Sequence, residues 1–224
     1  MGTPRQPHEP EGPSPSAANA MGAMDAMDTV RLRRLNRWQA EGMREDLADL
    51  YVESSDAVPG EEFPGRQRFL SRLAADVKLP GFDMLVAEAR SLTGCVFGFP
   101  VPRDGSWWQG FDGPLPQNLE QLTASGHVFA ILETVVHPHQ HSRGLARRLQ
   151  ERLLADHRAS LGVTLVDESD SAARSACSVL ETWGWQDVGR IHRPPGPTAL
   201  RVLVLPLGER TQDHPDGLGH IDRT

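Results

Sequence analysis

Several residue types are scarce in this chain. Its 224 residues include one tyrosine, one lysine and two cysteines. Two cysteines with no further ligand at a suitable spacing provide neither a disulfide framework nor a zinc site. Cys95 falls in an apolar strand pattern and Cys177 in a helical pattern. We therefore interpret both as small core side chains of a protein from a reducing compartment.

The chain also lacks long apolar runs and a surplus of basic residues. No apolar stretch approaches the roughly 20 residues that a membrane-spanning helix needs. The N-terminus has no basic, apolar and cleavable pattern of a secretory signal. The formal net charge is −7, whereas dedicated binders of nucleic acid or of anionic membranes are basic. We expect a cytoplasmic protein with neither nucleic acid nor membrane as a partner.

Both ends of the chain lack hydrophobic periodicity. Residues 1–28 are rich in Pro, Gly, Ser and Ala, and residues 208–224 have a similar character. Such segments cannot bury enough apolar surface to offset the entropy lost on ordering. We predict disordered tails at 1–28 and 208–224, and one domain of ordinary size at 29–207.

The central part alternates strand and helix patterns. A long, turn-rich loop at 100–125 contains Trp107 and Trp108, which either line a pocket or anchor the loop on the core. The order of elements predicts an α/β fold in which helices flank a mixed sheet. Strands are predicted at 30–35, 82–89, 92–99, 128–136, 163–166, 185–191 and 200–205, and helices at 38–57, 66–77, 144–157 and from 167–171 to about 183.

The most informative stretch runs from Val128 to Leu149. It has the pattern of a buried strand, a proline-containing turn and a helix whose first turn carries Gly144 and Ala146. A turn that opens a helix presents backbone N–H groups and the positive end of the helix dipole at one point. The pattern therefore predicts an anion-binding site at this turn.

This stretch resembles the GNAT family of N-acetyltransferases. The family's signature is a strand followed by a Gln/Arg-x-x-Gly-x-Gly/Ala turn into a helix, which here reads VVHPHQHSRGLARRL with His141 at the first position. The run SACSVLETWGWQDVG is similar to a second signature, a helix that ends in an aromatic-Gly-aromatic unit, here 183–185. The order of elements matches from 30 to 205. The resemblance implies a central mixed sheet flanked by helices, with splayed strands that form an acyl-coenzyme A cleft.

The resemblance also implies acetyl-coenzyme A as the acyl donor. The turn would hold its pyrophosphate, and the backbone after Glu133 would pair with its pantetheine arm, with the Val135 N–H as oxyanion donor. The residues assigned to the cofactor are Val135, Val136, His141, Ser142, Arg143, Gly144, Leu145, Ala146 and Arg147.

Glu133 is a carboxylate within an otherwise apolar strand. Buried carboxylates are rare unless they are paired or functional. The functional interpretation is a general base that deprotonates an alkyl ammonium before it attacks a thioester. Family members often carry a Glu on this strand in that role. The alternative is a side chain that faces solvent at a strand edge or bulge.

The general acid of the family is missing from its usual place. Many members carry a Tyr in the second-signature helix, where this chain has Leu180, and the single tyrosine is Tyr51. Ser178 and Cys177 are the nearest polar candidates, and we assign Ser178, with water as the alternative. His137, His139 and His141 alternate in the strand-to-helix turn, but Pro138 disrupts the strand geometry that a shared metal would require. We predict no metal and expect His141 to donate to phosphate.

These observations predict an acetyl-coenzyme A-dependent N-acetyltransferase. Glu133, Val135 and Ser178 are its candidate catalytic residues, and a small-molecule primary amine is its acceptor in a ternary complex. We expect a cationic acceptor because the chain is acidic, and we leave a homodimer open. Two alternatives remain: a non-catalytic acyl-coenzyme A sensor of the same fold, and an interaction domain that binds no cofactor.

Overall fold

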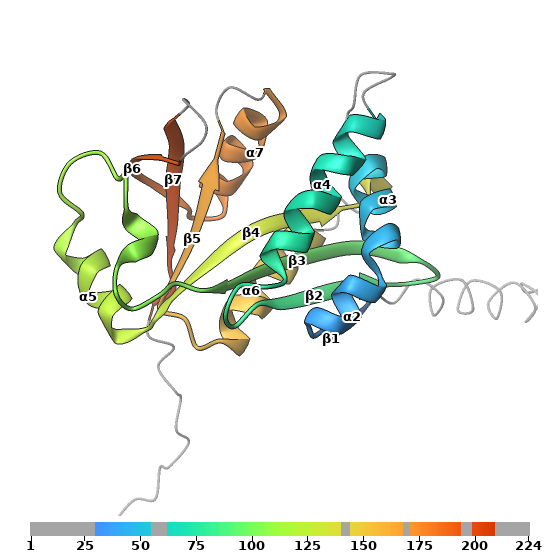
Figure 1. Cartoon of the computed structure of the whole chain (residues 1–224), viewed down its shortest axis with the longest axis horizontal. Coiled ribbons are helices and arrows are strands. Elements are labelled where there is room, and N and C mark those ends of the chain that lie inside the picture. Colours follow the sequence, from blue (N-terminus) through green and yellow to red (C-terminus); the bar gives the residue numbers. More distant parts are fainter. Residues whose placement is uncertain (1–29, 55–61, 140–143, 168–170, 194–198, 209–224) are drawn as a thin grey trace, which may run out of the picture.

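A seven-stranded sheet forms the centre of the molecule (Figure 1). The computed structural model describes residues 30–54, 62–139, 144–167, 171–193 and 199–208. The strands are β1 (Arg31–Leu35), β2 (Asp83–Glu88), β3 (Leu92–Pro100), β4 (Val128–Val136), β5 (Leu161–Val166), β6 (Gln186–His192) and β7 (Ala199–Pro206). The helices are α2 (Arg37–Gly42), α3 (Arg44–Ser54), α4 (Glu62–Asp76), α5 (Gln117–Ser125), α6 (Leu145–Asp156) and α7 (Ser171–Thr182), with a short 3₁₀ helix at Ser106–Trp108.

The sheet is mixed, as the sequence predicts. Its order is β1-β2-β3-β4-β5-β7-β6. Among the described strands, β4 and β5 form a parallel pair and the other neighbours are antiparallel. α6 connects the parallel pair. Because β4 and β5 are neighbours in the middle of the strand order, the β4–α6–β5 unit lies at the middle of the sheet.

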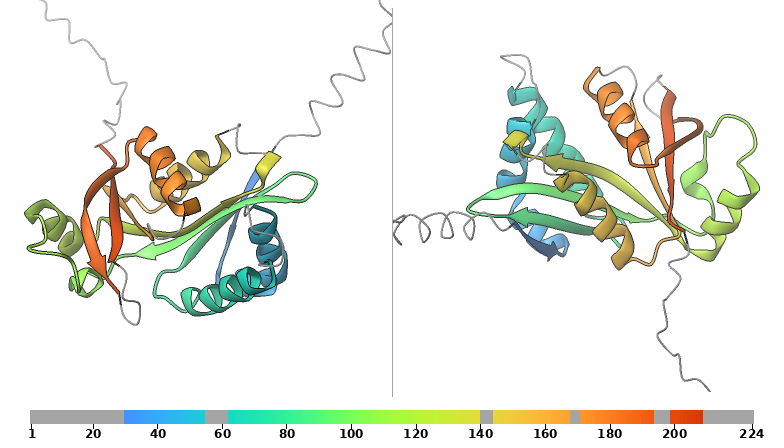
Figure 2. Two further views of the ribbon diagram at one scale, coloured as in Figure 1. Left: turned by 90° about the horizontal axis from the view of Figure 1, so that it is seen from above. Right: turned by 180° about the vertical axis from the view of Figure 1, so that it is seen from behind.

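Helices cover both faces of the sheet (Figure 2). α3 and α4 lie on one face, and α6 and α7 lie on the other. Leucines four residues apart give α6 its apolar stripe, and that stripe packs on β2, β3 and β4. The core of this face includes Leu85, Val96, Phe129, Ile131, Leu145, Leu149 and Leu153, and that of the α3–α4 face includes Leu47, Leu50, Phe69, Leu73, Met84, Val86, Cys95, Phe97 and Val135.

Two predicted elements differ from the structure by more than shifts at their ends. The single helix predicted at 38–57 is two helices, α2 and α3, separated at Met43 directly after Gly42, a residue of low helix propensity. The predicted loop at 100–125 contains α5, whose end at Gly126 adopts the left-handed conformation with φ +78°. The short helix was missed because its turn-rich surroundings masked the Leu119–Leu122 spacing.

The loop before α5 is attached to the body of the protein. The Trp108 Nε1 donates to Thr123 Oγ1 at 2.9 Å. Phe111 forms a β-bridge with Ile191, and the His192 N–H donates to Gly110 O at 2.8 Å. The loop therefore has a fixed position beside β6.

In the part of the chain that the structure describes, no helix has the length and apolar character to cross a membrane.

Candidate functional site

The central parallel pair separates soon after it forms. β4 and β5 pair only over Val128–Ala130 and Leu161–Val163. Beyond this point β4 continues to Val136 along β3, and β5 continues to Val166 along β7. The two strands diverge from a common base, as Figure 1 shows. No described strand pairs with this part of β4 on the β5 side, so backbone groups face the opening.

A bulge in β4 changes the direction of its side chains at the opening. Phe97 is opposite Glu133, whereas the next residue of β3, Gly98, is opposite Ile131. Leu132 is the extra residue, and a bulge of this kind interrupts the alternation of side chains. Leu132 and Glu133 therefore both face the α4 side. Thr134 faces α6, where its Oγ1 accepts a hydrogen bond from Gln150 Nε2 at 3.1 Å.

Glu133 is a partly buried carboxylate with one cationic partner. Its Oε2 lies 2.9 Å from Nη2 of Arg72 in α4, and 22% of its side chain remains accessible. Burial raises the pKa of the Glu133 carboxyl, the charge of Arg72 opposes this rise, and the charge of Asp76 adds to it. Glu133 is thus not a freely solvated strand-edge residue. A raised pKa makes the carboxylate a stronger base, which suits a group that accepts a proton.

Asp76 and Tyr51, which interact with Arg72, come from helices that are distant from β4 in the sequence. Burial also raises the pKa of Asp76, at the end of α4, and Arg72 opposes the rise. The Tyr51 ring of α3 lies 5.7 Å from the Arg72 guanidinium carbon. Asp76 and Arg72 were not predicted from the sequence, because an acidic residue and an arginine in a helix are ordinary surface features. Only the packing of α4 on β4 brings them to Glu133.

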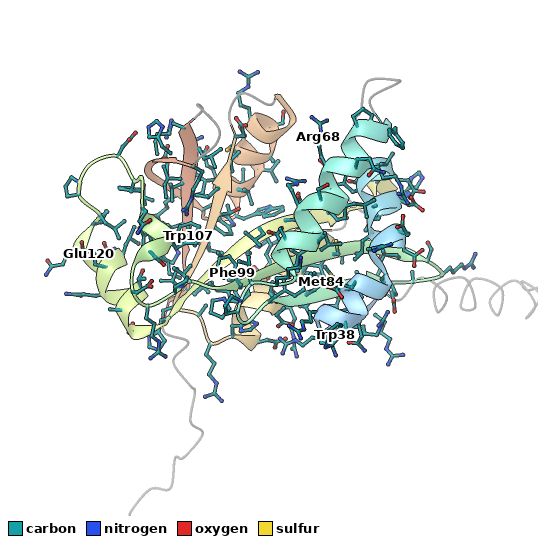
Figure 3. The ribbon with its side chains drawn as sticks, viewed as in Figure 1. Trp38, Arg68, Met84, Phe99, Trp107 and Glu120 are labelled. Atoms are coloured by element: carbon teal, nitrogen blue, oxygen red, sulfur yellow. The ribbon has the colours of Figure 1, made fainter. Side chains whose placement is uncertain are left out.

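A cavity of about 280 Å³ lies on the same face of the sheet. Leu132, next to Glu133, and Leu79, three residues after Asp76, both contribute to its wall. Figure 3 shows two other lining residues, Phe99 and Trp107, between α5 and α4. The remaining lining residues are Ile131, Leu165 and Arg193. The aromatic pair of the loop therefore divides its roles: Trp107 lines the cavity, and Trp108 anchors the loop.

Arg193 follows β6 and supplies the charge of this cavity. Its Nη2 donates to the Trp107 carbonyl, and its guanidinium carbon lies 5.0 Å from the centre of the Trp107 ring. Burial lowers the pKa of the Arg193 guanidinium. Arg193 was not predicted from the sequence either, since nothing in its local pattern distinguishes it from a surface arginine.

The pairing of β4 with β3 determines which backbone amides face the opening. The His137 N–H donates to Thr93 O at 2.9 Å. In an antiparallel ladder the hydrogen-bonded pairs alternate, so Val135 and Cys95, two positions further along the ladder, also form a hydrogen-bonded pair. This directs the Val135 N–H toward β3, and the amides of Thr134 and Val136 toward the opening. The oxyanion role of Val135 stays a prediction that this ladder does not favour.

The predicted anion turn is described in part. His141, Ser142 and Arg143 lie outside the described residues. Gly144 precedes α6 with φ +64°, and a Cβ placed on it would meet no atom within 4 Å. Gly144 is thus required by its backbone conformation, because the space outside it is open. Open space at a helix N-terminus leaves room for an anion.

The first turn of α6 supplies backbone rather than side chains. Leu145 is buried in the core, and Ala146 packs against that core. The Arg147 Nε donates to Glu151 Oε1 at 2.8 Å within the same helix. These side chains have structural partners, so any contact with an anion from Leu145 or Ala146 would come from their N–H groups.

The candidates for the general acid and for a metal are not gathered at Glu133. Ser178 is exposed on α7, whereas Cys177 is buried in the core. His137 lies 3.7 Å from Glu53, measured from Nε2 to Oε2, and its ring centre is 4.9 Å from that of His139. Within the described ranges no group of three His, Cys, Asp or Glu side chains has the geometry to hold a metal ion.

Comparisons by sequence find no relative. No protein-family profile matches the chain, and no curated protein matches it. Solved structures do match. An acetyltransferase from Thermus thermophilus has a TM-score of 0.53 at 15% identity and covers 81% of this chain and 99% of its own. A GNAT-family acetyltransferase described as putative, from Desulfovibrio desulfuricans, has a TM-score of 0.52 at 13% identity, with coverages of 80% and 99%.

A third match was solved with a ligand. The PaiA N-acetyltransferase from Thermoplasma acidophilum, in complex with coenzyme A, has a TM-score of 0.50 at 11% identity and covers 80% of this chain and 99% of its own. At such identities the likeness concerns the fold. The seven-stranded mixed sheet, its single described parallel pair and these matches agree with one another. The chain has the fold of the GNAT acetyltransferases.

Proposed function

We propose that this protein transfers an acetyl group from acetyl-coenzyme A to a primary amine of a small molecule. The observation that carries the proposal is the bulge at Leu132. Leu132 lines the cavity that Trp107 also lines, and Glu133, the next residue of β4, faces the α4 side at the opening between β4 and β5. The amide of Thr134 would bind the pantetheine arm, and the N-terminus of α6 would bind the pyrophosphate.

The chain's residues would act in a fixed order. Glu133 removes a proton from the ammonium group of the acceptor, and the freed amine attacks the thioester carbon. An N–H of β4 at the opening stabilises the oxyanion that forms. The carbon–sulfur bond then breaks, the thiolate takes a proton from water, and the hydroxide left behind takes the second proton of the new amide. Glu133 returns the proton of the ammonium group to solvent. Water is sufficient here because a thiol with a pKa of about 8.5 is a fair leaving group.

The sensor alternative rests on the absence of a tyrosine in α7 at the position of Leu180. A sensor would bind acetyl-coenzyme A without releasing thiol, whereas an interaction domain would not bind it. Calorimetry on the full chain, followed by a thiol-release assay with a panel of primary amines, separates the three. Binding together with amine-dependent release is the expected result.

The Glu133→Gln variant tests the base. We expect acetyl-coenzyme A affinity near that of the wild type and a fall in kcat/KM of about 10²- to 10⁴-fold, the usual contribution of a general base. The loss should be greatest below the pKa of the amine, because there the acceptor must be deprotonated. Glu53→Gln, an exposed glutamate on α3, is the matched control. Equal activity of wild type and Glu133→Gln across pH would remove Glu133 from the mechanism.

A further inference from the structure

We propose that the acceptor carries a carboxylate in addition to its amine, and that Arg193 binds this carboxylate in the cavity beside Glu133. The inference rests on the proposed function, because it names the class of amine that the same site takes. It differs from the expectation of a cationic acceptor that the net charge suggested.

The character of the cavity wall is the first argument. Of the described residues that line it, six are apolar or aromatic, and Arg193 is the charged one. An apolar cavity with one placed charge orients a ligand by that charge and accommodates the rest of it by shape. Because the charge is positive, it selects an anionic group. The overall negative charge of the chain does not describe this site.

The surroundings of Arg193 are the second argument. Among the described residues no carboxylate lies within ion-pair distance of its guanidinium, and its described side-chain contacts are the carbonyl and the ring of Trp107. Arg72 and Arg201, by contrast, each have carboxylate partners. A half-buried cation without a counter-ion is unfavourable, and a bound carboxylate would supply one. A guanidinium fixed on one side by Trp107 keeps further N–H donors for a bidentate contact.

The position of the acidic residues is the third argument. Leu132 and Leu79 line the cavity, Glu133 directly follows Leu132 in the chain, and Asp76 precedes Leu79 by three residues. The cavity therefore has a cation in its wall and carboxylates close in the chain to two other lining residues. An amino carboxylate has the complementary arrangement, with its ammonium toward Glu133 and its carboxylate toward Arg193. A cavity of about 280 Å³ suits an acceptor of amino-acid size.

The test compares acceptors that differ only in one group. Apolar α-amino acids and straight-chain ω-amino acids are each assayed beside the matching carboxamide. The carboxylate-to-amide ratio of kcat/KM is compared between the wild type and each variant at one pH, so that the difference in amine basicity cancels. We expect the carboxylates to be preferred in the wild type. Arg193→Met should lower kcat/KM for carboxylates by about 10- to 100-fold and change that for amides little. Arg193→Lys should restore part of the preference.

The ratio of kcat/KM for the carboxylate to that for the amide distinguishes recognition of the carboxylate by Arg193 from a structural role of Arg193. If Arg193 only holds Trp107 in position, Arg193→Met lowers kcat/KM for both acceptors equally, and the proposal is wrong. Arg44→Met is the control, because it also removes one positive charge, at an exposed site of α3. It should leave the ratio unchanged.

A binding measurement distinguishes failure of this proposal from failure of the proposed function. The coenzyme A complex is titrated with N-acetyl amino acids and with their amides. Acetylation without preference for carboxylates overturns the Arg193 proposal and keeps the transferase. Carboxylate binding that Arg193→Met abolishes, without turnover of any amine, supports the Arg193 site and overturns the transferase. The lack of both turnover and binding overturns both.

Discussion

At the scale of single residues, the site depends on three charges that share one environment. Glu133 and Asp76 are two carboxyls with raised pKa, and Arg72 contacts the first and opposes the rise at both. A base must be ionised to accept a proton, so activity should fall as the pH drops through the raised pKa of Glu133. Arg72 keeps that pKa from rising further, and Asp76 acts in the opposite direction.

Neutralising Arg72 and neutralising Asp76 should therefore move the acid limb of the pH–rate profile in opposite directions. Arg72→Gln removes a charge that lowers the pKa of Glu133, so the limb should move to higher pH. Asp76→Asn removes a charge that raises this pKa, so the limb should move to lower pH. The shift from Arg72→Gln should be modest, because Arg72 is half exposed and its charge is screened.

The control for this pair is Arg44→Gln, an exposed arginine on the neighbouring helix α3. It should leave the acid limb in place. Shifts of the two test variants in the same direction would show that the limb does not report Glu133.

At the scale of elements, the sequence predicted most of the fold because most strands and helices carry clear patterns. The bounds of β4 match the prediction, since an apolar run ends there at a proline turn. The bulge at Leu132 could not be derived from the residues, because Leu132 and Glu133 fit a regular strand equally well. Only the register against β3 shows it. Arg193 and Asp76 were missed for the same reason: their roles arise from packing between distant segments.

The bulge in β4 requires a glycine at position 98 of β3. A Cβ at this position would lie 1.9 Å from the Ala130 carbonyl oxygen and 2.8 Å from a ring carbon of Phe129. Gly98→Ala should therefore destabilise the protein by about 1–3 kcal/mol or more, because β3 and β4 must separate at the bulge. Urea unfolding followed by tryptophan fluorescence measures this change.

Gly42→Ala is the matched control. A Cβ at Gly42, the last residue of α2, meets nothing within 4 Å. This variant should stabilise the protein by about 0.4–1 kcal/mol, since alanine loses less entropy on folding. Equal effects of the two substitutions would mean that β3 approaches β4 less closely at the bulge than the structure indicates.

At the scale of the whole molecule, the sheet has two arms joined by a short ladder. Strands β1–β4 form one arm and β5–β7 the other, and three residue pairs of β4 and β5 connect them. A ligand that occupies the opening between the arms adds contacts that the folded protein alone cannot make there. Its binding should stabilise the fold as a unit, because it binds the folded state and not the unfolded chain.

Acetyl-coenzyme A should therefore raise the melting temperature in proportion to the logarithm of its concentration. At 100 times Kd the gain is about 2.7 kcal/mol, which corresponds to roughly 5–10 °C for a domain of this size. Gly144→Asp and Gly144→Asn both introduce residues that tolerate the left-handed conformation, and they differ in charge. Gly144→Asp should lose most of the shift because its carboxylate repels pyrophosphate, whereas Gly144→Asn should retain more of it. Equal shifts in the two variants would place the phosphates away from the N-terminus of α6, even if acetyl-coenzyme A still stabilised the protein.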